Sequence, residues 1–470
     1  MMMILTVLVY FLILFGVSRW TSRKATNDTF FRAERKSPWY MVAFGMVGAS
    51  ISGVTFVSVP GMVLHMQMTY MQMCLGFIVG YFVVAFVLLP LYYRLNLISI
   101  YTYLGQRLGP RAYRTGAWFF LLSKMCGAAV AFYVVCALMT DSLTADGGGL
   151  SFLLTVVVMV ALIWFYTRRG GIKTLVWTDT LQTVCLLGAL LLMIYKVMTA
   201  LDMTAAEAVS AVSSHPMSRI FVFDDWASRQ NFWKQFLSGV FVVIVMTGLD
   251  QDKMQKNLTC KTLREAQKDM CTYGFAFVPV NLLFLSLGVL LVLLAGRQGV
   301  TLPTMGDELL PGYVSASAAT EVLFVLGIVA ASFSSADSAL TSMTTSVCVD
   351  ICQRPDDERL RKRVHLLMCA VFVVFILLFR WLNSTSVIDA VYVLVSYTYG
   401  PLLGLFAFGL LTHRTPRDRF VPYICVASPV VCLLIDKAAQ AAGYTFGYEL
   451  LMLNGLLTFL MLWAFSKKNV

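Results

Sequence analysis

Long apolar runs, each about the length of a bilayer crossing, alternate along the chain with short polar connections. Because a helix rises 1.5 Å per residue, roughly 20 consecutive apolar residues span the hydrocarbon core. The pattern therefore predicts an all-α polytopic membrane protein with about thirteen transmembrane helices. Their expected ranges are 2–19, 38–64, 68–93, 115–140, 150–167, 174–199, 229–249, 270–296, 318–347, 364–382, 386–411, 420–438 and 447–465.

Composition indicates the same class. Of the 470 residues, 59% are hydrophobic and only 13% are charged, and a soluble protein of this size does not need so much apolar surface. We interpret the net charge of +11 through membrane topology and not as a sign of nucleic-acid binding. The run at 2–19 lacks a preceding basic segment and a small-residue cleavage site, so we expect a retained helix and no signal peptide.

Lysine and arginine gather in every second connection. Counted with Arg19 at the end of the first run, the connections that follow the odd-numbered runs hold 28 of the 36 Lys and Arg residues, among them Lys24, Lys253, Lys256 and Lys468. The positive-inside rule assigns these connections to the cytoplasm. We therefore expect a multi-pass protein of the plasma (cytoplasmic) membrane, the inner membrane in a bacterial cell, with its N-terminus outside and its C-terminus in the cytoplasm.

Three connections carry further signals. Residues 200–228 and 297–317 form long outward segments, and the Gly and Pro residues of 297–317 are compatible with short helices over an outer vestibule. On the inner side, residues 99–115 alternate apolar and basic positions. They fit either a short amphipathic helix on the membrane surface or an ordinary interfacial loop.

The run at 318–347 is unusual because it is apolar enough to cross a membrane and yet rich in oxygen-bearing side chains. Residues three and four positions apart share a helix face, which places Ala331, Ser334, Ser335 and Ser338 on one stripe with Asp337 at its edge. Hard cations bind several oxygen ligands, and hydroxyls with a carboxylate supply them. The alternative is that these hydroxyls bond to carbonyls of their own helix or hold helices together.

The run at 38–64 is punctuated by Gly45, Gly48, Gly53 and Gly61, with serines between them. Such a segment can unwind inside the membrane and free carbonyls for a cavity or an ion. The same small residues also favour a close helix crossing. The sequence alone does not choose between the two.

Six motifs, in order from about residue 30 to 411, carry a resemblance to a known family. The chain resembles the sodium:solute symporter family, which includes the sodium/glucose, proline and sialic acid cotransporters. The motifs are FFRAERKSPWYMVAFGMVGASISGVTFVSVPG, ISIYTYLGQRLGPRAYR, TRRGGIKTLVWTDTLQ, GLDQDKMQKNLTCKTLREAQK, GDELLPGY with AASFSSADSALTS, and SYTYGPLLGLFAFGLL. Each motif is loose alone, but the ordered set is specific.

The resemblance implies a leucine-transporter-type core of two inverted five-helix repeats. It divides the chain into an extra helix and loop at 1–37, a first repeat at 38–199, an outward loop at 200–228, a second repeat at 229–411, and two further helices at 412–470. The implied function is a sodium-coupled symporter, not an enzyme, that imports a small organic solute by alternating access. Sodium is the implied cofactor, and the solute, sodium and membrane lipid are the expected partners, with no nucleic acid and no obligate protein partner.

The resemblance also implies two cation sites. The first would use the carbonyls of Gly48, Ile51 and Ala331 and the hydroxyls of Ser334 and Ser335. Some family members bind a second sodium, and the matching residues here are Asp179, Asp337 and Ser338, with Ser334. Asp337 stands where those members have serine, so this carboxylate could strengthen cation binding, pair with a basic residue or take a proton. For Asp179, a structural role near the cytoplasmic interface is the alternative.

Alignment with sugar-binding members gives the implied substrate pocket, which is too apolar for a hexose and fits a small, partly apolar or anionic solute better. Its residues would be Thr55, Met73, Cys74, Phe77, Val243, Met246 and Thr247. Lys124 lies about eleven residues into its run, on the order of 16 Å from the helix end, and so needs a partner. We expect either pairing with Asp337 or another core acid, or a counter-charge for an anionic substrate.

Two other function classes fit less well. A twelve-helix facilitator of another fold would have an even number of spans and a basic cytoplasmic loop at the midpoint of the chain. An intramembrane hydrolase would need a buried base beside its serines, whereas the four histidines (His65, His215, His365 and His413) are expected at span edges or in loops.

Overall fold

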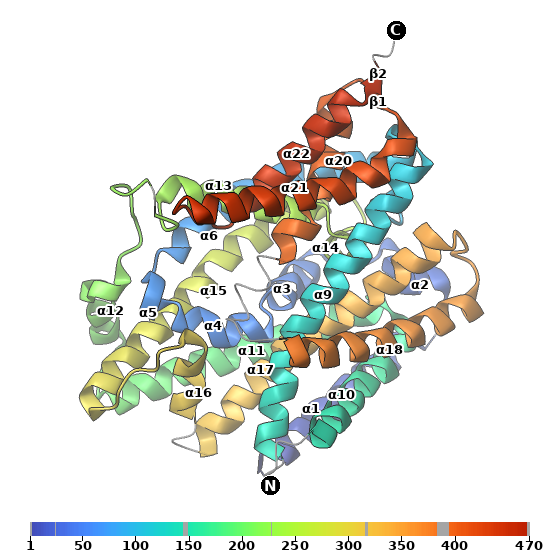
Figure 1. Ribbon diagram of the computed structural model, residues 1–470. Coiled ribbons are helices and arrows are strands. Elements are labelled where there is room, and N and C mark those ends of the chain that lie inside the picture. The colour runs from blue at the N-terminus through green and yellow to red at the C-terminus, as the bar shows by residue number, and fades with distance from the viewer. Residues whose placement is uncertain are drawn as a thin grey trace.

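The computed structural model describes residues 2–23, 25–143, 149–226, 228–314, 318–382 and 394–467. Lys24, Lys468 and residues 386–393 of the predicted span 386–411 lie outside them. Helices dominate the fold (Figure 1). The one strand pair among the described residues joins β1 (Thr415–Pro416) antiparallel to β2 (Ser466–Lys467).

The helices follow the predicted apolar runs closely. Up to residue 200 they are α1 (Met2–Thr21), α2 (Asn27–Arg32), η1 (Ala33–Arg35), α3 (Trp39–Ser50), α4 (Gly53–Gly61), α5 (Val63–Met66), α6 (Tyr70–Val83), η2 (Val84–Leu88), α7 (Leu89–Arg94), α8 (Thr102–Arg107), α9 (Pro110–Leu143), α10 (Gly149–Gly170) and α11 (Ile172–Ala200). Beyond it they are α12 (Ala205–Ser214), η3 (Pro216–Ser218), α13 (Phe232–Val243), η4 (Ile244–Gly248), α14 (Gln251–Asn257), α15 (Leu263–Gln298), η5 (Gly306–Glu308), α16 (Leu309–Val314), α17 (Ala318–Ser346), η6 (Val347–Ile351), α18 (Glu358–Leu382), α20 (Gly400–Leu411), η7 (Asp418–Phe420), α21 (Val421–Ala441) and α22 (Leu450–Ala464).

Within the described residues, 8 helices are long and apolar enough to cross a membrane alone, and the number rises to 10 if each of two sharply bent pairs forms one span. Three shorter apolar helices, Leu5–Thr21, Gly400–Leu411 and Leu450–Ala464, coincide with the remaining predicted spans. These helices establish a polytopic helical membrane protein. The total of thirteen crossings remains a prediction.

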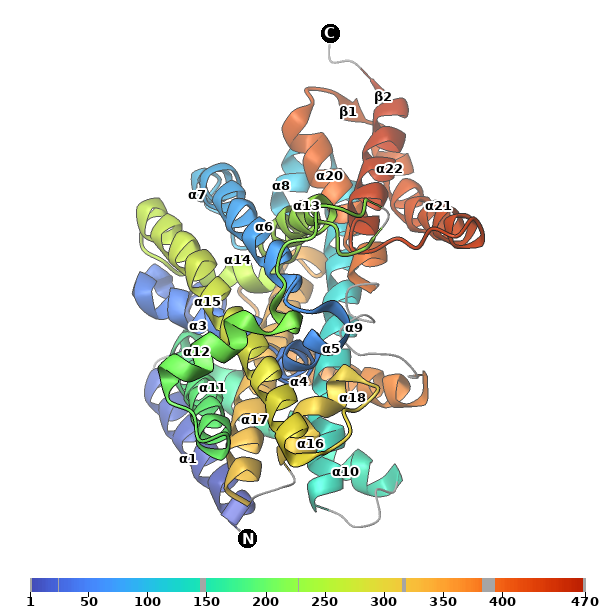
Figure 2. The ribbon, with the colours of Figure 1, turned by 90° about the vertical axis from the view of Figure 1, so that its left-hand side faces the viewer.

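Helix α17 forms the centre of the molecule. It packs against α11, α9, α18, α4, α14 and α3, and 78% of its most apolar window is buried, compared with 28% for α18 and for α21. Helices α20, α21 and α22 lie together at the top of both views (Figures 1 and 2). The polar stripe of α17 is thus enclosed by protein, where an unpaired polar group would be costly.

The first bent pair is α3 with α4, which meet at an angle of 62°. Ile51 has extended backbone angles (φ −89°, ψ 94°), and Ser52 starts α4 by accepting a hydrogen bond from Thr55 N at 3.4 Å. The same segment also makes a close crossing, since a Cβ on Gly48 would lie 2.0 Å from Thr183 Oγ1 on α11. Both interpretations of the glycine-rich run therefore hold: the helix breaks, and its small residues pack closely.

The second bent pair, α13 with α14, was not predicted. The π-helical turn η4 ends α13, Asp250 is extended and accepts from Asp252 N at 2.8 Å, and α14 leaves at 69°. Our placement of Lys253 and Lys256 in a cytoplasmic connection was wrong, because α14 carries them into the core with 8% and 1% of their surface exposed. Lys253 and Lys256 of the GLDQDKMQKN segment therefore belong to the buried helix α14. Lys261, Arg264 and Lys268 come after this helix.

Two connections contain the short helices that were considered. In 99–115, α8 occupies Thr102–Arg107, Arg107 donates to the Thr412 carbonyl, and α9 already begins at Pro110, earlier than the predicted 115. In 297–317, η5 and α16 pack against α4. There a Cβ on Gly61 would lie 1.9 Å from the Gly306 carbonyl oxygen, so a side chain would prevent this close approach.

Candidate ion and substrate site

The polar stripe of α17 meets the break between α3 and α4. Ser335 Oγ lies 3.3 Å from the Ala49 carbonyl oxygen and 3.2 Å from the Ala331 carbonyl oxygen. Ile51 is fully buried, and its N–H donates to the Gly48 carbonyl at 3.1 Å. The backbone at the break thus lies next to the hydroxyls of α17, as the sodium hypothesis requires.

The donor atoms gathered here are of the kind that a sodium ion binds. The carbonyl oxygens of Ala49 at the break and of Ala331 on α17 lie within hydrogen-bond distance of the Ser335 hydroxyl, and carbonyl and hydroxyl oxygens are the ligands that hard cations bind. Ser335 and the carbonyls of Ala49 and Ala331 thus fit a sodium ion by type and lie together, whereas the Ser334 hydroxyl donates to Asp179 Oδ1 at 2.7 Å. The full predicted set of Gly48, Ile51, Ala331, Ser334 and Ser335 remains a prediction.

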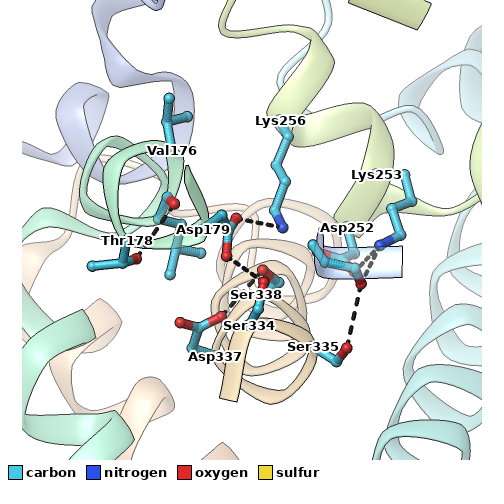
Figure 3. Close-up of polar contacts among 12 residues, drawn as sticks. Val176, Thr178, Asp179, Asp252, Lys253, Lys256, Ser334, Ser335, Asp337 and Ser338 are labelled. Carbon is cyan, nitrogen blue, oxygen red and sulfur yellow. Dashed lines mark hydrogen bonds and ion pairs between the residues drawn. The ribbon is translucent and has the colours of Figure 1, made fainter. Parts of the chain in front are cut away.

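The predicted second cation group contains a cation of the protein's own. Asp179 Oδ2 lies 2.7 Å from Lys256 Nζ, and Asp179 Oδ1 accepts from Ser334 Oγ at 2.7 Å (Figure 3). Asp337 Oδ2 accepts from Tyr166 Oη at 2.7 Å, while its Oδ1 accepts from Ser338 Oγ at 3.2 Å. All of these side chains are buried. Asp337 thus pairs with hydroxyls and Asp179 with a lysine.

A cavity of about 210 Å³ opens beside the ion site, between α4, α6, α9, α13, α14, α15 and α17. Of the predicted pocket residues, Thr55, Phe77, Lys124, Val243, Met246 and Thr247 line it. Met73 and Cys74 are fully buried in α6 and are not among its lining residues, since the backbone of Met73 faces Gly239 of α13 instead. Ser335 lines the cavity as well, which places the ion site on its wall.

Four charged groups line this cavity. Lys124 Nζ lies 2.7 Å from Asp252 Oδ2 and 3.2 Å from Asp250 Oδ2, so it pairs with two core acids and not with Asp337. Lys253 Nζ is 4.0 Å from Asp252 Oδ2 and donates to the Ala49 carbonyl at 2.8 Å. Lys124 is therefore compensated by two carboxylates, whereas Lys253, as far as the described residues show, has one carboxylate, at 4.0 Å.

The charges on α14 were missed because the sequence reasoning treated every basic residue after a span as cytoplasmic. The signal was present in GLDQDKMQKN: Asp252 and Lys256 stand four residues apart, and no glycine or proline falls between Gln251 and Asn257. The inference that no histidine is buried was also wrong, although His365 does stand at the start of its predicted span, 364–382. His365 is 1% exposed and bonds to Thr167 and Thr344 at 2.8 and 2.9 Å.

Comparisons with known proteins agree with this geometry. The model of the sodium:solute symporter family matches residues 30–418. The chain is 24% identical to the sodium/sialic acid symporter of Aliivibrio fischeri over 90% of this chain and 85% of that protein. It is 26% identical to the human sodium/iodide cotransporter over 54% of this chain and 38% of that protein.

The structure of a Na⁺-coupled sialic acid symporter in a substrate-bound outward-open state superimposes with a TM-score of 0.81, covering 98% of this chain and 97% of that one at 19% identity. The fold is thus that of the leucine-transporter type, and the relatives are transporters and not enzymes. The chain belongs to the sodium:solute symporter family and is a multi-pass membrane protein that couples solute transport to sodium by alternating access.

Proposed function

We propose that this symporter carries a small, partly apolar organic anion in the cavity, with the coupling sodium bound between the α3–α4 break and α17. The supporting observation is the Ala49 carbonyl oxygen, which Ser335 of the ion site and Lys253 of the cavity both contact, at 3.3 and 2.8 Å. The Ala49 carbonyl is thus a backbone group common to the proposed sodium site and the proposed anion site.

The sodium ligands are the carbonyls of Gly48, Ile51 and Ala331 and the hydroxyls of Ser334 and Ser335. The hydroxyl of Ser335 now donates to carbonyls, and it can turn its oxygen toward an ion, since a hydroxyl both donates and accepts. When Ser335 turns its oxygen to the ion, its hydrogen bond to the Ala49 carbonyl is lost, and that carbonyl is also the acceptor of Lys253 in the cavity. The ion site and the cavity therefore share one backbone group, and any effect of sodium on substrate binding is matched by an equal effect of the substrate on sodium binding.

The anionic character of the solute follows from the charges in the cavity. Lys124 is held by both acids, so among the described residues that line the cavity Lys253 is the cation without a carboxylate oxygen closer than 4.0 Å. The remaining wall is largely apolar, with Val54, Phe77 and Val243 among its residues. A carboxylate with a short apolar body would pair with Lys253 and bury its carbon atoms there. Sialic acid and iodide, which the relatives are named for, are also anions at neutral pH.

The test is uptake by proteoliposomes under an inward sodium gradient, screened over organic acids, amino acids, sugars and vitamins. We expect uptake of an organic acid, and a loss of at least tenfold in apparent substrate affinity in Lys253→Met. The control is Lys437→Met, an exposed lysine of α21, which should transport normally. A neutral sugar as the transported solute, or normal transport of the organic acid by Lys253→Met, would refute the anion assignment.

The topology completes the proposal. We place thirteen crossings in the plasma membrane, with the N-terminus outside, the C-terminus in the cytoplasm, and the inverted repeats at 38–199 and 229–411. In agreement, α12 and α16 from the predicted outward segments lie at the lower left of Figure 1, whereas α2 and β1 lie at the right and top. Reporter fusions after Lys467 and within 205–214 should give opposite sidedness; the same sidedness at both would refute this arrangement.

A further inference from the structure

The second cation group differs from a sodium site in one respect: a lysine already occupies the place of the ion. Lys256 Nζ contacts Asp179 Oδ2 at 2.7 Å, and the other oxygen of the same carboxylate accepts from Ser334 at 2.7 Å. Figure 3 shows the ammonium reaching Asp179 from α14, above Ser334 and Ser338. Both oxygens of Asp179, the carboxylate that α11 contributes to this group, are therefore engaged before any ion arrives.

This lysine is fixed in place. It is 1% exposed, and residues on either side anchor α14: Gln255 donates to the Phe31 carbonyl and to Thr345 Oγ1, each at 2.9 Å. Asn257 donates to Asp269 Oδ2 at 2.5 Å. A buried ammonium with these neighbours cannot move into water without unpairing Asp179 in the core, which is strongly unfavourable.

We propose that Lys256 is a tethered cation that replaces the second sodium, so that the transporter binds one sodium per chain and not two. The ammonium supplies the positive charge that Asp179 needs, and the lysine never dissociates during transport. While Lys256 is present, Asp337 adds no second ion site, because the lysine already supplies the positive charge of this group; the two oxygens of Asp337 accept from Tyr166 and Ser338.

This inference rests on the proposed first sodium site but has its own prediction. Replacing the lysine by an uncharged side chain of similar length leaves Asp179 and Asp337 without a cation in a pocket that also holds Ser334 and Ser338. That pocket then matches the oxygen-rich chemistry of a sodium site. Removal of Lys256 should therefore add an ion-binding site.

The experiment counts bound ²²Na⁺ per purified full-length protein at the lowest sodium concentration that fills the wild-type site, in wild type, Lys256→Met, Lys256→Arg, Ser335→Ala and the double variant Ser335→Ala/Lys256→Met. Because Ser335→Ala weakens the first site, we expect one, two, one, well below one and one ions, respectively. Uptake should depend on sodium with a Hill coefficient near one in wild type and above one in Lys256→Met.

The outcomes separate the two proposals. Two ions in wild type, or no gain in folded Lys256→Met, would overturn the tethered cation. One ion in Ser335→Ala would instead place the wild-type sodium elsewhere and overturn the first site, while a gain of one in Lys256→Met would still support the tether. If Lys256→Met does not purify, the wild-type count decides between one ion, which supports the tether, and two, which contradict it.

Discussion

The two broken helices of the core differ in the side chains that hydrogen-bond to the backbone carbonyls at each break. Each break frees backbone carbonyls inside the protein, where an unpaired group would be costly. At the α13–α14 break, Tyr92 and Tyr101 donate to the carbonyls of Gly248 and Leu249, both at 2.9 Å. At the α3–α4 break, the Ala49 carbonyl is contacted by Ser335 and Lys253.

The partners determine what each break can do. The tyrosines are bulky, buried side chains from neighbouring segments, so the carbonyls at the α13–α14 break are not available to a ligand. The role of this break is structural, because it directs the short charged helix α14 into the core. A serine hydroxyl and a lysine are partners that an ion or an anion can displace. The α3–α4 break can therefore exchange ligands, and the following predictions test this difference.

The largest effect is expected from Lys124→Met. This variant leaves Asp250 and Asp252 buried without their nearest cation, and removing one partner of a buried ion pair costs about 3–5 kcal/mol. We expect a strongly lowered melting temperature in detergent, largely recovered in Lys124→Met/Asp252→Asn. An unchanged melting temperature in the single variant would show that the charges on α14 do not depend on Lys124.

The second-largest effect is expected from Gly48→Ala. The added Cβ would lie 2.0 Å from Thr183 Oγ1 and 3.0 Å from Thr183 Cα, so α3 must move away from α11, at a cost of about 1–3 kcal/mol. Sodium-dependent uptake should fall because the break shifts relative to α17. The control is Gly188→Ala on α11, where nothing lies within 4 Å of the added Cβ. Equal behaviour of the two variants would contradict the close crossing.

Tyr101→Phe should affect stability alone. It leaves the Leu249 carbonyl unpaired in a buried setting, which costs about 1–3 kcal/mol. The melting temperature should fall, while the sodium concentration for half-maximal uptake stays the same. If the half-maximal concentration rises while the melting temperature holds, the α13–α14 break takes part in ion binding and the contrast between the two breaks fails.

Much of this arrangement could be read from the sequence, because spans and polar stripes depend on local periodicity. Each predicted apolar range coincides with described helical residues. Glycine punctuation and hydroxyl spacing singled out the two helices, and the family resemblance implied that residues 48–51 meet Ser335. The partners of Lys124 and Asp179 could not be foreseen in the same way. These partners depend on the 69° angle between α13 and α14 at Leu249 and Asp250. That angle is a tertiary feature, and the residues of α14 themselves include no glycine or proline that would have indicated it.

The central claim is that the α3–α4 break and the hydroxyls of α17 hold the coupling sodium. Its most direct test is the sodium concentration for half-maximal uptake in Ser335→Ala, with Ser342→Ala as the control. Ser342 lies two turns along the same helix, and among the described residues its hydroxyl donates to the Ala339 carbonyl of its own helix, at 3.0 Å. We predict a rise of at least tenfold, about 1.4 kcal/mol, in Ser335→Ala and no change in Ser342→Ala. Wild-type sodium dependence in both variants would contradict the account.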